Sequence, residues 1–225
     1  MASATSGSAR SASLTAEPSA ECALCPRLVT FREQNNADEP DWFNGAVPSF
    51  GPSDARFLII GLAPGRGGAN KTGRPFTGDY AGDLLYATLG EFGFSRGQYA
   101  ARPDDGLELV DCMITNAVRC VPPANKPTTS EIKQCRTFLT NRVQQLPELR
   151  VMLALGRIAH EQTLSALGEK RSAHVFGHGA RHELGGGLVL YDSYHCSRYN
   201  TNTGRLTPEM FQDVFAKIRE TLDAD

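Results

Sequence analysis

The chain has 225 residues, of which 40% are hydrophobic and 21% are charged, a length and composition that suit one α/β domain better than two. Its 23 Lys and Arg residues nearly balance 25 Asp and Glu residues, which gives a formal net charge of −2. This balance argues against a protein that coats nucleic acid indiscriminately, so any contact with DNA must come from local basic patches.

The first 21 residues are rich in Ser and Ala and contain no continuous apolar stretch. We predict that residues 1–21 form a disordered tail and that residues 22–225 form the domain. The tail lacks the apolar core of a secretory signal, and it carries an acidic residue, Glu17, that a transit peptide would usually lack. No segment approaches the ~20 apolar residues of a membrane span. We therefore expect a cytoplasmic, monomeric protein without membrane association.

Helical and strand patterns alternate along the rest of the chain. In order, they predict helix 22–35, strand 56–61, helix 79–93, strand 107–118, helix 129–146, strand 149–155, helix 157–168, strand 188–193 and helix 208–222. A Gly- and His-rich turn after residue 168 has room for one further short strand. This alternation predicts an α/β fold with a parallel sheet covered on both faces. Two helix starts are well marked, because Thr128 and Glu131 form a capping box and Thr207 precedes Pro208.

The most unusual stretch is the loop from Gly61 to Asp79, which we call the site loop. It follows the apolar run 56–60 and contains six glycines and two prolines. A loop of this kind lies at the carboxyl end of a strand, where open α/β sheets bind ligands. Loops longer than about 12–15 residues are usually functional or disordered, so a binding site is favoured over an ordinary surface turn.

Six cysteines are unevenly spaced. In a cytoplasmic chain, the pair Cys22-x-x-Cys25 indicates metal or redox chemistry before it indicates a disulfide. Cys120 ends a strand and Cys135 lies in the second turn of the following helix, so these two thiols could face one centre. Four such cysteines can hold Zn²⁺ or an iron–sulfur cluster, and spacing alone does not choose between them. Cys112 alternates with apolar neighbours and is interpreted as a packing residue.

Four ordered motifs join the site loop to later segments. They are Gly-Leu-Ala-Pro-Gly at 61–65, Gly-Arg-Pro-Phe-Thr-Gly-Asp at 73–79, Thr-Asn-Ala-Val-Arg-Cys at 115–120, and the run from Ser-Tyr-His-Cys to Gly-Arg-Leu-Thr at 193–207. Together they resemble the uracil-DNA glycosylase superfamily and, within it, the iron–sulfur branch called family 5 or type B. The resemblance covers nearly the whole chain from Cys22 onwards.

This resemblance implies a three-layer α/β/α fold with a central four-stranded parallel sheet. It also implies a [4Fe–4S] cluster on Cys22, Cys25, Cys120 and Cys135. The substrate would be bound by the first residues of the site loop, which are Gly61, Leu62, Ala63, Pro64 and Gly65.

The chemistry of base excision suggests roles for three further residues, because the base must leave the stack and enter a pocket that reads its edge. Phe76 would stack on the flipped base, a contact worth ~1–3 kcal/mol, and Asn116 would bond both N3–H and O4 of uracil. His195 would donate to uracil O2 as negative charge grows there. By residue type alone, the three would instead be a core plug, a turn former and a satisfied surface residue.

The segment after His195 is expected to enter the minor groove of DNA. Its phosphate contacts would be made by Ser197, Arg198, Asn202 and Arg205, which would position the protein without specifying sequence. The competing interpretation of these residues is a set of solvated surface groups.

Two features mark the reaction centre as unusual. Leu62 stands where related branches place an acidic residue that positions water, as it does in family 5 members, so Asp79 is the candidate carboxylate for that role. Its competing role is the N-cap of a helix. Cys196 stands where the family usually has proline after the catalytic histidine.

The favoured function is therefore a DNA repair glycosylase that acts on DNA containing uracil or other deaminated bases, such as hypoxanthine and xanthine. It would be monofunctional, because no lysine stands at a site position to form a Schiff base. A P-loop NTPase is an alternative, since 65–72 nearly matches the phosphate-binding motif, but Asn70 replaces a required glycine. A third hypothesis is a non-catalytic iron–sulfur sensor of DNA lesions.

Overall fold

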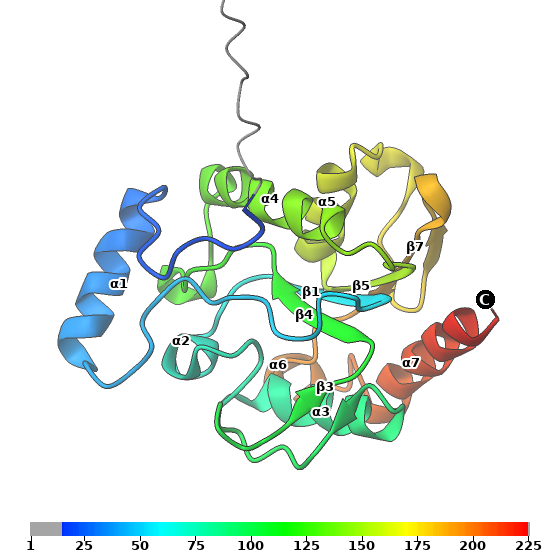
Figure 1. Ribbon diagram of the computed structural model, residues 1–225, viewed down its shortest axis with the longest axis horizontal. Helices are drawn as coiled ribbons and strands as arrows, with labels where there is room; N and C mark the ends of the chain where they lie inside the picture. The colour runs from blue at the N-terminus through cyan, green and yellow to red at the C-terminus, as the bar shows by residue number, and fades with distance from the viewer. Residues whose placement is uncertain (1–14, 225) are drawn as a thin grey trace, which may run out of the picture.

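A five-stranded sheet lies at the centre of the computed structural model, which describes residues 15–224 (Figure 1). Its parallel strands are, in spatial order, β4 (Cys112–Asn116), β1 (Phe57–Gly61), β5 (Val151–Leu155) and β7 (Val189–Ser193). The short strand β6 (Arg181–Glu183) adds an antiparallel edge beyond β7. The predicted α/β fold with four central parallel strands is thus confirmed, and β6 lies in the Gly- and His-rich turn.

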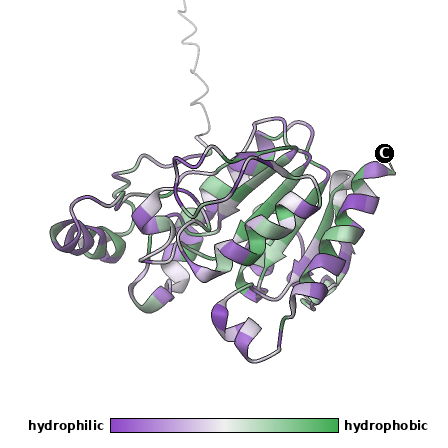
Figure 2. Cartoon of the chain, turned by 90° about the horizontal axis from the view of Figure 1, so that it is seen from below, coloured by the Kyte–Doolittle hydropathy of each residue, from purple (hydrophilic) through white to green (hydrophobic). Residues whose placement is uncertain are grey.

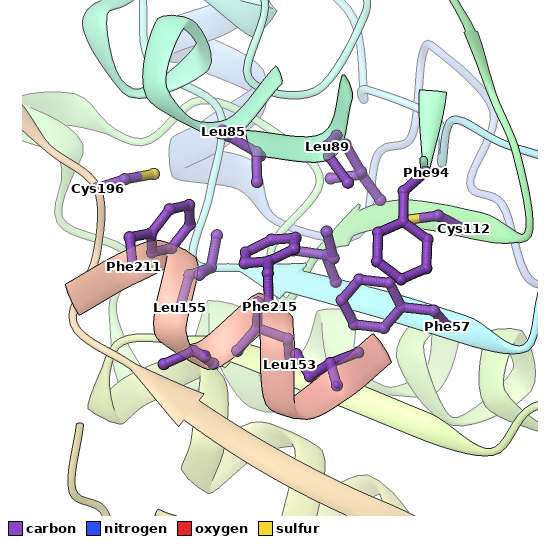
Figure 3. Packing of buried hydrophobic residues seen from close by; sticks show 14 of the residues in the cluster. Phe57, Leu85, Leu89, Phe94, Cys112, Leu153, Leu155, Cys196, Phe211 and Phe215 are labelled. Carbon is purple, nitrogen blue, oxygen red and sulfur yellow. The ribbon is translucent and has the colours of Figure 1, made fainter. Parts of the chain in front are cut away.

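Helices cover both faces of this sheet. They are α3 (Tyr80–Glu91) and α7 (Pro208–Asp223) on one face, and α4 (Thr129–Gln144) and α5 (Arg157–Leu167) on the other. Under α3 and α7, Phe57 packs against Phe94 and Phe215 with ring centroids 4.9 and 5.9 Å away (Figure 3). The second core contains Leu58 and Ile60 of the same strand. Every residue of β1, β4 and β5 is buried, and most of their side chains are apolar because both faces of the sheet are covered (Figure 2).

Smaller elements complete the fold. They are α1 (Pro26–Asp38), α2 (Ala69–Thr72), β2 (Ser95–Arg96), β3 (Glu108–Leu109), η1 (Pro123–Asn125), η2 (Arg171–Ala173), η3 (Gly185–Gly187) and α6 (Arg198–Asn202). Both predicted helix caps are present, because Thr128 forms a capping box with Glu131 and Thr207 accepts a hydrogen bond from the backbone N–H of Met210. Within the described residues, no helix combines the length and apolar character needed to cross a membrane.

The register of the sheet gathers the strand ends that matter for function. Gly61 pairs with Asn116, and Leu155 pairs with Ser193. The four parallel strands therefore end at one edge, where open α/β sheets bind ligands.

Two predicted boundaries are wrong. The strand predicted at 107–118 is two strands, β3 and β4, because Asp111 between them has a φ of +55°. The carboxylate of Asp111 accepts hydrogen bonds from the backbone and the guanidinium of Arg56, which holds this turn. The helix predicted at 22–35 starts only at Pro26, which is favoured at the first helical position, so Cys22 and Cys25 precede α1 in extended or turn backbone.

The predicted tail is also wrong for residues 15–21, whereas residues 1–14 lie outside the described part of the chain. Ala16 is buried, and Glu17 accepts hydrogen bonds from Arg119 and Arg142 at 2.9 and 2.5 Å. The side chain of Arg119 is only 1% exposed. A buried guanidinium needs a carboxylate partner, and the residues before Cys22 supply it.

A second buried ion pair supports the site loop. Arg74 and Asp105 form two parallel hydrogen bonds of 2.7 Å, with side chains 5% and 1% exposed. The guanidinium also lies over the rings of Phe50, Tyr86 and Tyr99. Arg74 is therefore a structural residue of the loop and does not face solvent.

Replacing Asp105 with Asn should cost about 3–5 kcal/mol of unfolding free energy, because it leaves the Arg74 charge buried without its partner. Glu183→Gln, which breaks the more exposed pair with Arg181, is the matched control and should cost less than about 1 kcal/mol. Urea unfolding measures both, and equal losses would contradict the argument.

The same pair predicts a pH dependence. Hydrogen bonds from Arg74 hold the pKa of Asp105 well below its usual value of 3.8. The stabilisation is therefore complete above about pH 4 and is lost as the pH falls further, and Asp105→Asn should remove that part of the acid dependence.

Candidate active site

A cavity of about 360 Å³ lies at the carboxyl ends of β1 and β4. Most residues expected from the sequence line it, namely Leu62, Ala63, Pro64, Gly65, Phe76, Asp79, Asn116, His195, Ser197 and Arg198. Gly61 lies directly beneath two of them, whereas Asn202 lies on α6 and Arg205 borders a neighbouring cavity that shares His195. Segments that are more than a hundred residues apart thus form one site.

Gly61 is required by close packing. A Cβ atom at this position would lie 2.3 Å from Oδ1 of Asn116 and 2.8 Å from Cζ of Phe76. A side chain here would push Asn116 and Phe76 out of their observed positions, so glycine allows both residues to close over the end of β1.

Asn116 presents an unpaired acceptor. It is the last residue of β4 and is 3% exposed, and its buried Oδ1 atom has no hydrogen-bond partner within the described residues. A buried acceptor without a partner costs about 1–3 kcal/mol. This oxygen is therefore suited to a ligand that brings an N–H group into the cavity.

Phe76 is held in a strained conformation. Its φ is +53°, and its carbonyl oxygen accepts a hydrogen bond from the Tyr99 hydroxyl at 3.3 Å. Gly82 allows the close approach of α3, since a Cβ there would lie 1.8 Å from that same oxygen. The Phe76 ring is 7% exposed and stacks against His195 with centroids 5.8 Å apart. It is both part of the core and a wall of the cavity, so the two interpretations of its role are compatible.

His195 is neutral in this site. It follows the end of β7 by two residues, and burial lowers its pKa to about 4. Asn200 donates a hydrogen bond of 2.8 Å to its backbone carbonyl, which fixes the loop. A neutral imidazole can donate a hydrogen bond at physiological pH without carrying a charge.

Asp79 combines both roles considered from the sequence. Its Oδ1 accepts a hydrogen bond of 3.2 Å from the N–H of Gly82 and caps α3. Its Oδ2 faces the site loop, where a Cβ on Gly68 would lie only 2.4 Å away. Burial raises the pKa of Asp79, so the carboxylate is a better proton acceptor than an exposed one.

Cys196 anchors the segment after His195. It is fully buried, and its thiol lies 3.4 Å from the carbonyl oxygen of Ala81 in α3, near Leu85 and Phe211 (Figure 3). The thiol thus connects the histidine to the same helix that Asp79 caps.

The loop expected after His195 contains the short helix α6, which the sequence interpretation missed. Ser197 caps it by accepting a hydrogen bond from the N–H of Asn200. Arg198 lies over the ring of Tyr80 at 5.2 Å, and Arg205 lies over Tyr194 at 4.5 Å. The guanidinium group of Arg198 is thereby held at this cavity, and that of Arg205 at the neighbouring one.

Four lining residues were not predicted, namely Ala69, Tyr80, Ala81 and Asn125. Tyr80, the first residue of α3, and Asn125, in the turn after Cys120, both border the cavity. Asn125 has a φ of +56° in a turn that follows two prolines. Because Asn tolerates a positive φ, its residue type at this place in the sequence was the available sign of a tight turn.

The P-loop interpretation does not match the local hydrogen bonding. The N–H groups of Asn70, Lys71 and Thr72 donate to carbonyl oxygens of Gly65 and Gly68. They close the four-residue helix α2, whereas a P-loop keeps such groups free to bind phosphate.

The four predicted cysteine ligands come together beside the start of α1. Cys22, Cys25, Cys120 and Cys135 line one small pocket, although 113 residues separate the first from the last. Their surroundings are apolar and include Leu28 and Val118.

Burial and the neighbouring backbone determine the protonation of this group. Burial, with a contribution from neighbouring thiols, raises the pKa of Cys120 to about 12 and that of Cys135 to about 11. The N–H of Arg119 donates to the sulfur of Cys135 at 3.3 Å, and Arg32 lies 4.0 Å from the sulfur of Cys120. Four converging thiols in apolar surroundings fit a zinc ion or an iron–sulfur cluster, which would stabilise them as thiolates.

The chain is similar to a family model and to several known proteins. The uracil DNA glycosylase superfamily matches residues 48–219. A type-5 uracil-DNA glycosylase of Thermus thermophilus is 48% identical over 204 residues, which cover 88% of this chain and 92% of that protein. One of Mycobacterium tuberculosis is 40% identical over 208 residues, covering 88% and 77%. A type-4 uracil-DNA glycosylase of Sulfurisphaera tokodaii is 30% identical over 186 residues, covering 78% and 74%.

Proposed function

Because the chain belongs to the uracil DNA glycosylase superfamily, we propose that it hydrolyses the N-glycosidic bond of deoxyuridine in DNA and leaves an abasic site. It is an enzyme of the uracil-DNA glycosylase class, and its site is formed within one chain, which supports action as a monomer. The observation that carries the proposal is the unpaired Oδ1 of Asn116 in a cavity walled by Phe76 and His195.

Base recognition follows from the amide of Asn116. Its Oδ1 would accept the N3–H of uracil, and its amide nitrogen would donate to O4. Phe76 would stack on the flipped base, and the missing side chain at Gly61 gives the Phe76 ring room to lie there. The first residues of the site loop form the adjoining wall.

Bond cleavage sends an electron pair from the C1′–N1 bond into the uracil ring. His195 would donate a hydrogen bond to O2, where negative charge grows. Because burial keeps the imidazole neutral, it would stabilise the uracil anion through an existing N–H dipole rather than by transferring a proton.

Water must add to C1′ from the opposite side of the sugar. Leu62 brings no carboxylate to the cavity, so Asp79 would position the water and accept its proton, with the basicity that its raised pKa supplies. The Oδ2 atom is the candidate acceptor, since Oδ1 is engaged with Gly82.

DNA would be held by residues beside the cavity, namely Ser197, Arg198, Asn202 and Arg205. Stacking on Tyr80 and Tyr194 orients the two arginines. They would bind phosphates while the α6 segment enters the minor groove.

The range of bases extends beyond uracil in this proposal. Hypoxanthine and xanthine also present a ring N–H beside a carbonyl, which the Asn116 amide can bind. The cavity of about 360 Å³ lies within the usual size of small-molecule pockets, so it leaves room for a purine.

The four cysteines would hold a [4Fe–4S] cluster, for which they supply thiolate ligands. Bound there, the cluster would serve a structural role by linking the segment before α1 to the turn after β4 and to α4. Such a link would close a loop of nearly a hundred residues, and it would stabilise the fold because it lowers the conformational entropy of the unfolded chain.

Asn116→Asp should lower single-turnover excision of uracil by about 5–150-fold, because a carboxylate repels O4 and leaves a polar group unpaired at a cost of ~1–3 kcal/mol. Asn36→Asp, at an exposed position of α1, is the matched control. An unchanged rate in Asn116→Asp would show that Asn116 does not bind the base. If the unaltered protein binds DNA that contains uracil but releases no uracil, the protein is a lesion sensor instead.

His195→Ala should lower excision more than Asp79→Ser. One preorganised donor to a developing oxyanion is worth about 10²–10³ in rate, whereas serine keeps the helix cap and removes only the carboxylate. A larger effect of Asp79→Ser on uracil and on a poorer leaving base, with folding intact, would assign the main catalytic role to water activation.

Anaerobically purified protein should contain iron and acid-labile sulfide and be brown. Substituting serine for any one of the four ligands should abolish the colour, whereas Cys112→Ala, in the hydrophobic core, should keep it. Stoichiometric zinc without sulfide in the unaltered protein would overturn the cluster assignment.

A further inference from the structure

A second group of potential metal ligands lies far from the cysteines, at the β7–β6 end of the sheet. His160 of α5 and His182 of β6 both contact Asp192 of β7. The distances are 2.8 Å from His160 Nδ1 to Asp192 Oδ1 and 2.9 Å from His182 Nε2 to Asp192 Oδ2. All the ligand atoms lie within 4.8 Å of one another.

This group is buried and has no part in the excision chemistry. The side chains of His160, His182 and Asp192 are 2%, 10% and 0% exposed. Because side chains alternate along a strand, Asp192 lies on the same face as Leu190, toward α5. A fully buried carboxylate is costly unless positive charge compensates it.

Each ring nitrogen of His160 has one hydrogen-bond partner, and Nδ1 is the one that contacts the carboxylate. Its Nε2 lies 3.0 Å from the carbonyl oxygen of His174, which can only accept, so Nε2 carries a proton. Without a metal, Nδ1 donates to Asp192 Oδ1 as the second N–H of an imidazolium. A bound zinc ion would take the place of that proton between Nδ1 and the carboxylate. Metal-ligating histidines show this arrangement, in which the second ring nitrogen donates to a backbone carbonyl.

Backbone groups of the turn before β6 also hold Asp192. Its Oδ2 accepts a hydrogen bond of 3.3 Å from the N–H of Gly177, and its backbone pairs with Gly179 and Ala180. The carboxylate is therefore fixed between two imidazoles that come from two different elements.

We propose that His160 Nδ1, His182 Nε2 and the Asp192 carboxylate form a zinc site. Imidazole and carboxylate ligands suit Zn²⁺ among the abundant divalent ions. At bond lengths of about 2.0–2.1 Å, tetrahedral ligand atoms lie about 3.3 Å apart. Each nitrogen–oxygen pair would therefore open by about 0.5 Å, and the two histidines, which now contact different oxygens of Asp192, would turn toward one shared ion. A cavity of about 160 Å³ borders His160 and His174 on the solvent side of the group.

Such an ion would fasten α5 and β6 to β7. Since β7 ends two residues before His195, the site would support the strand that carries the catalytic histidine. The ion itself lies on the α5 face of the sheet and takes no part in base excision.

The test titrates cluster-loaded, anaerobically purified protein with zinc chloride against a chromogenic chelator. One saturable zinc per chain is expected. His160→Gln or His182→Gln should weaken its binding at least about tenfold. His174→Gln is the matched control, because it keeps the backbone carbonyl that orients His160 and should keep the affinity.

X-ray absorption at the zinc edge provides a measurement that does not depend on the variants folding. Ligand distances of about 2.0–2.1 Å to nitrogen and oxygen would support the site, whereas distances of about 2.3 Å to sulfur would place the zinc on the cysteines. Absence of saturable zinc, sulfur-only coordination, or equal loss of affinity in His174→Gln would each overturn the proposal.

Discussion

The candidate site depends on the absence of a side chain at Gly61. The end of β1 must pass beneath Asn116 and Phe76 at distances that would bring a Cβ to 2.3 and 2.8 Å from their atoms. Parallel pairing of β1 with β4 sets Gly61 directly beside Asn116. The ring of Phe76 packs over Gly61 and stacks with His195. The missing side chain at Gly61 therefore allows three distant parts of the chain to come together.

Burial gives the converging groups their chemical properties. The same low-polarity surroundings lower the pKa of His195, raise that of Asp79 and leave Oδ1 of Asn116 without a partner. Each of these features is unfavourable for folding, since a buried polar group loses its hydration. Each also suits a ligand that brings a ring N–H, a carbonyl oxygen and a water molecule. Buried ion pairs such as Arg74 with Asp105 hold the site loop in place.

Helix α1 connects the cysteine group to this loop. It begins directly after Cys25, and Asn35 near its end accepts a hydrogen bond of 2.6 Å from Arg66 in the site loop. Asn70 in the same loop donates to Asn44 at 2.9 Å, and Asn44 in turn donates to the carbonyl of Glu39 just past the helix. The cysteine group and the site loop are thus both connected to α1.

The sequence by itself determined the features that depend on local order. Apolar runs identified the four parallel strands, and Thr128 and Thr207 marked helix starts, because periodicity and capping act over a few residues. The ordered motifs identified most of the residues that line the cavity. Tertiary structure alone decided which distant residues meet. It brought Glu17 to Arg119, buried Arg74 against Asp105, and joined His160 to Asp192. Such pairs depend on sheet order and on the burial of charge, which no local pattern records.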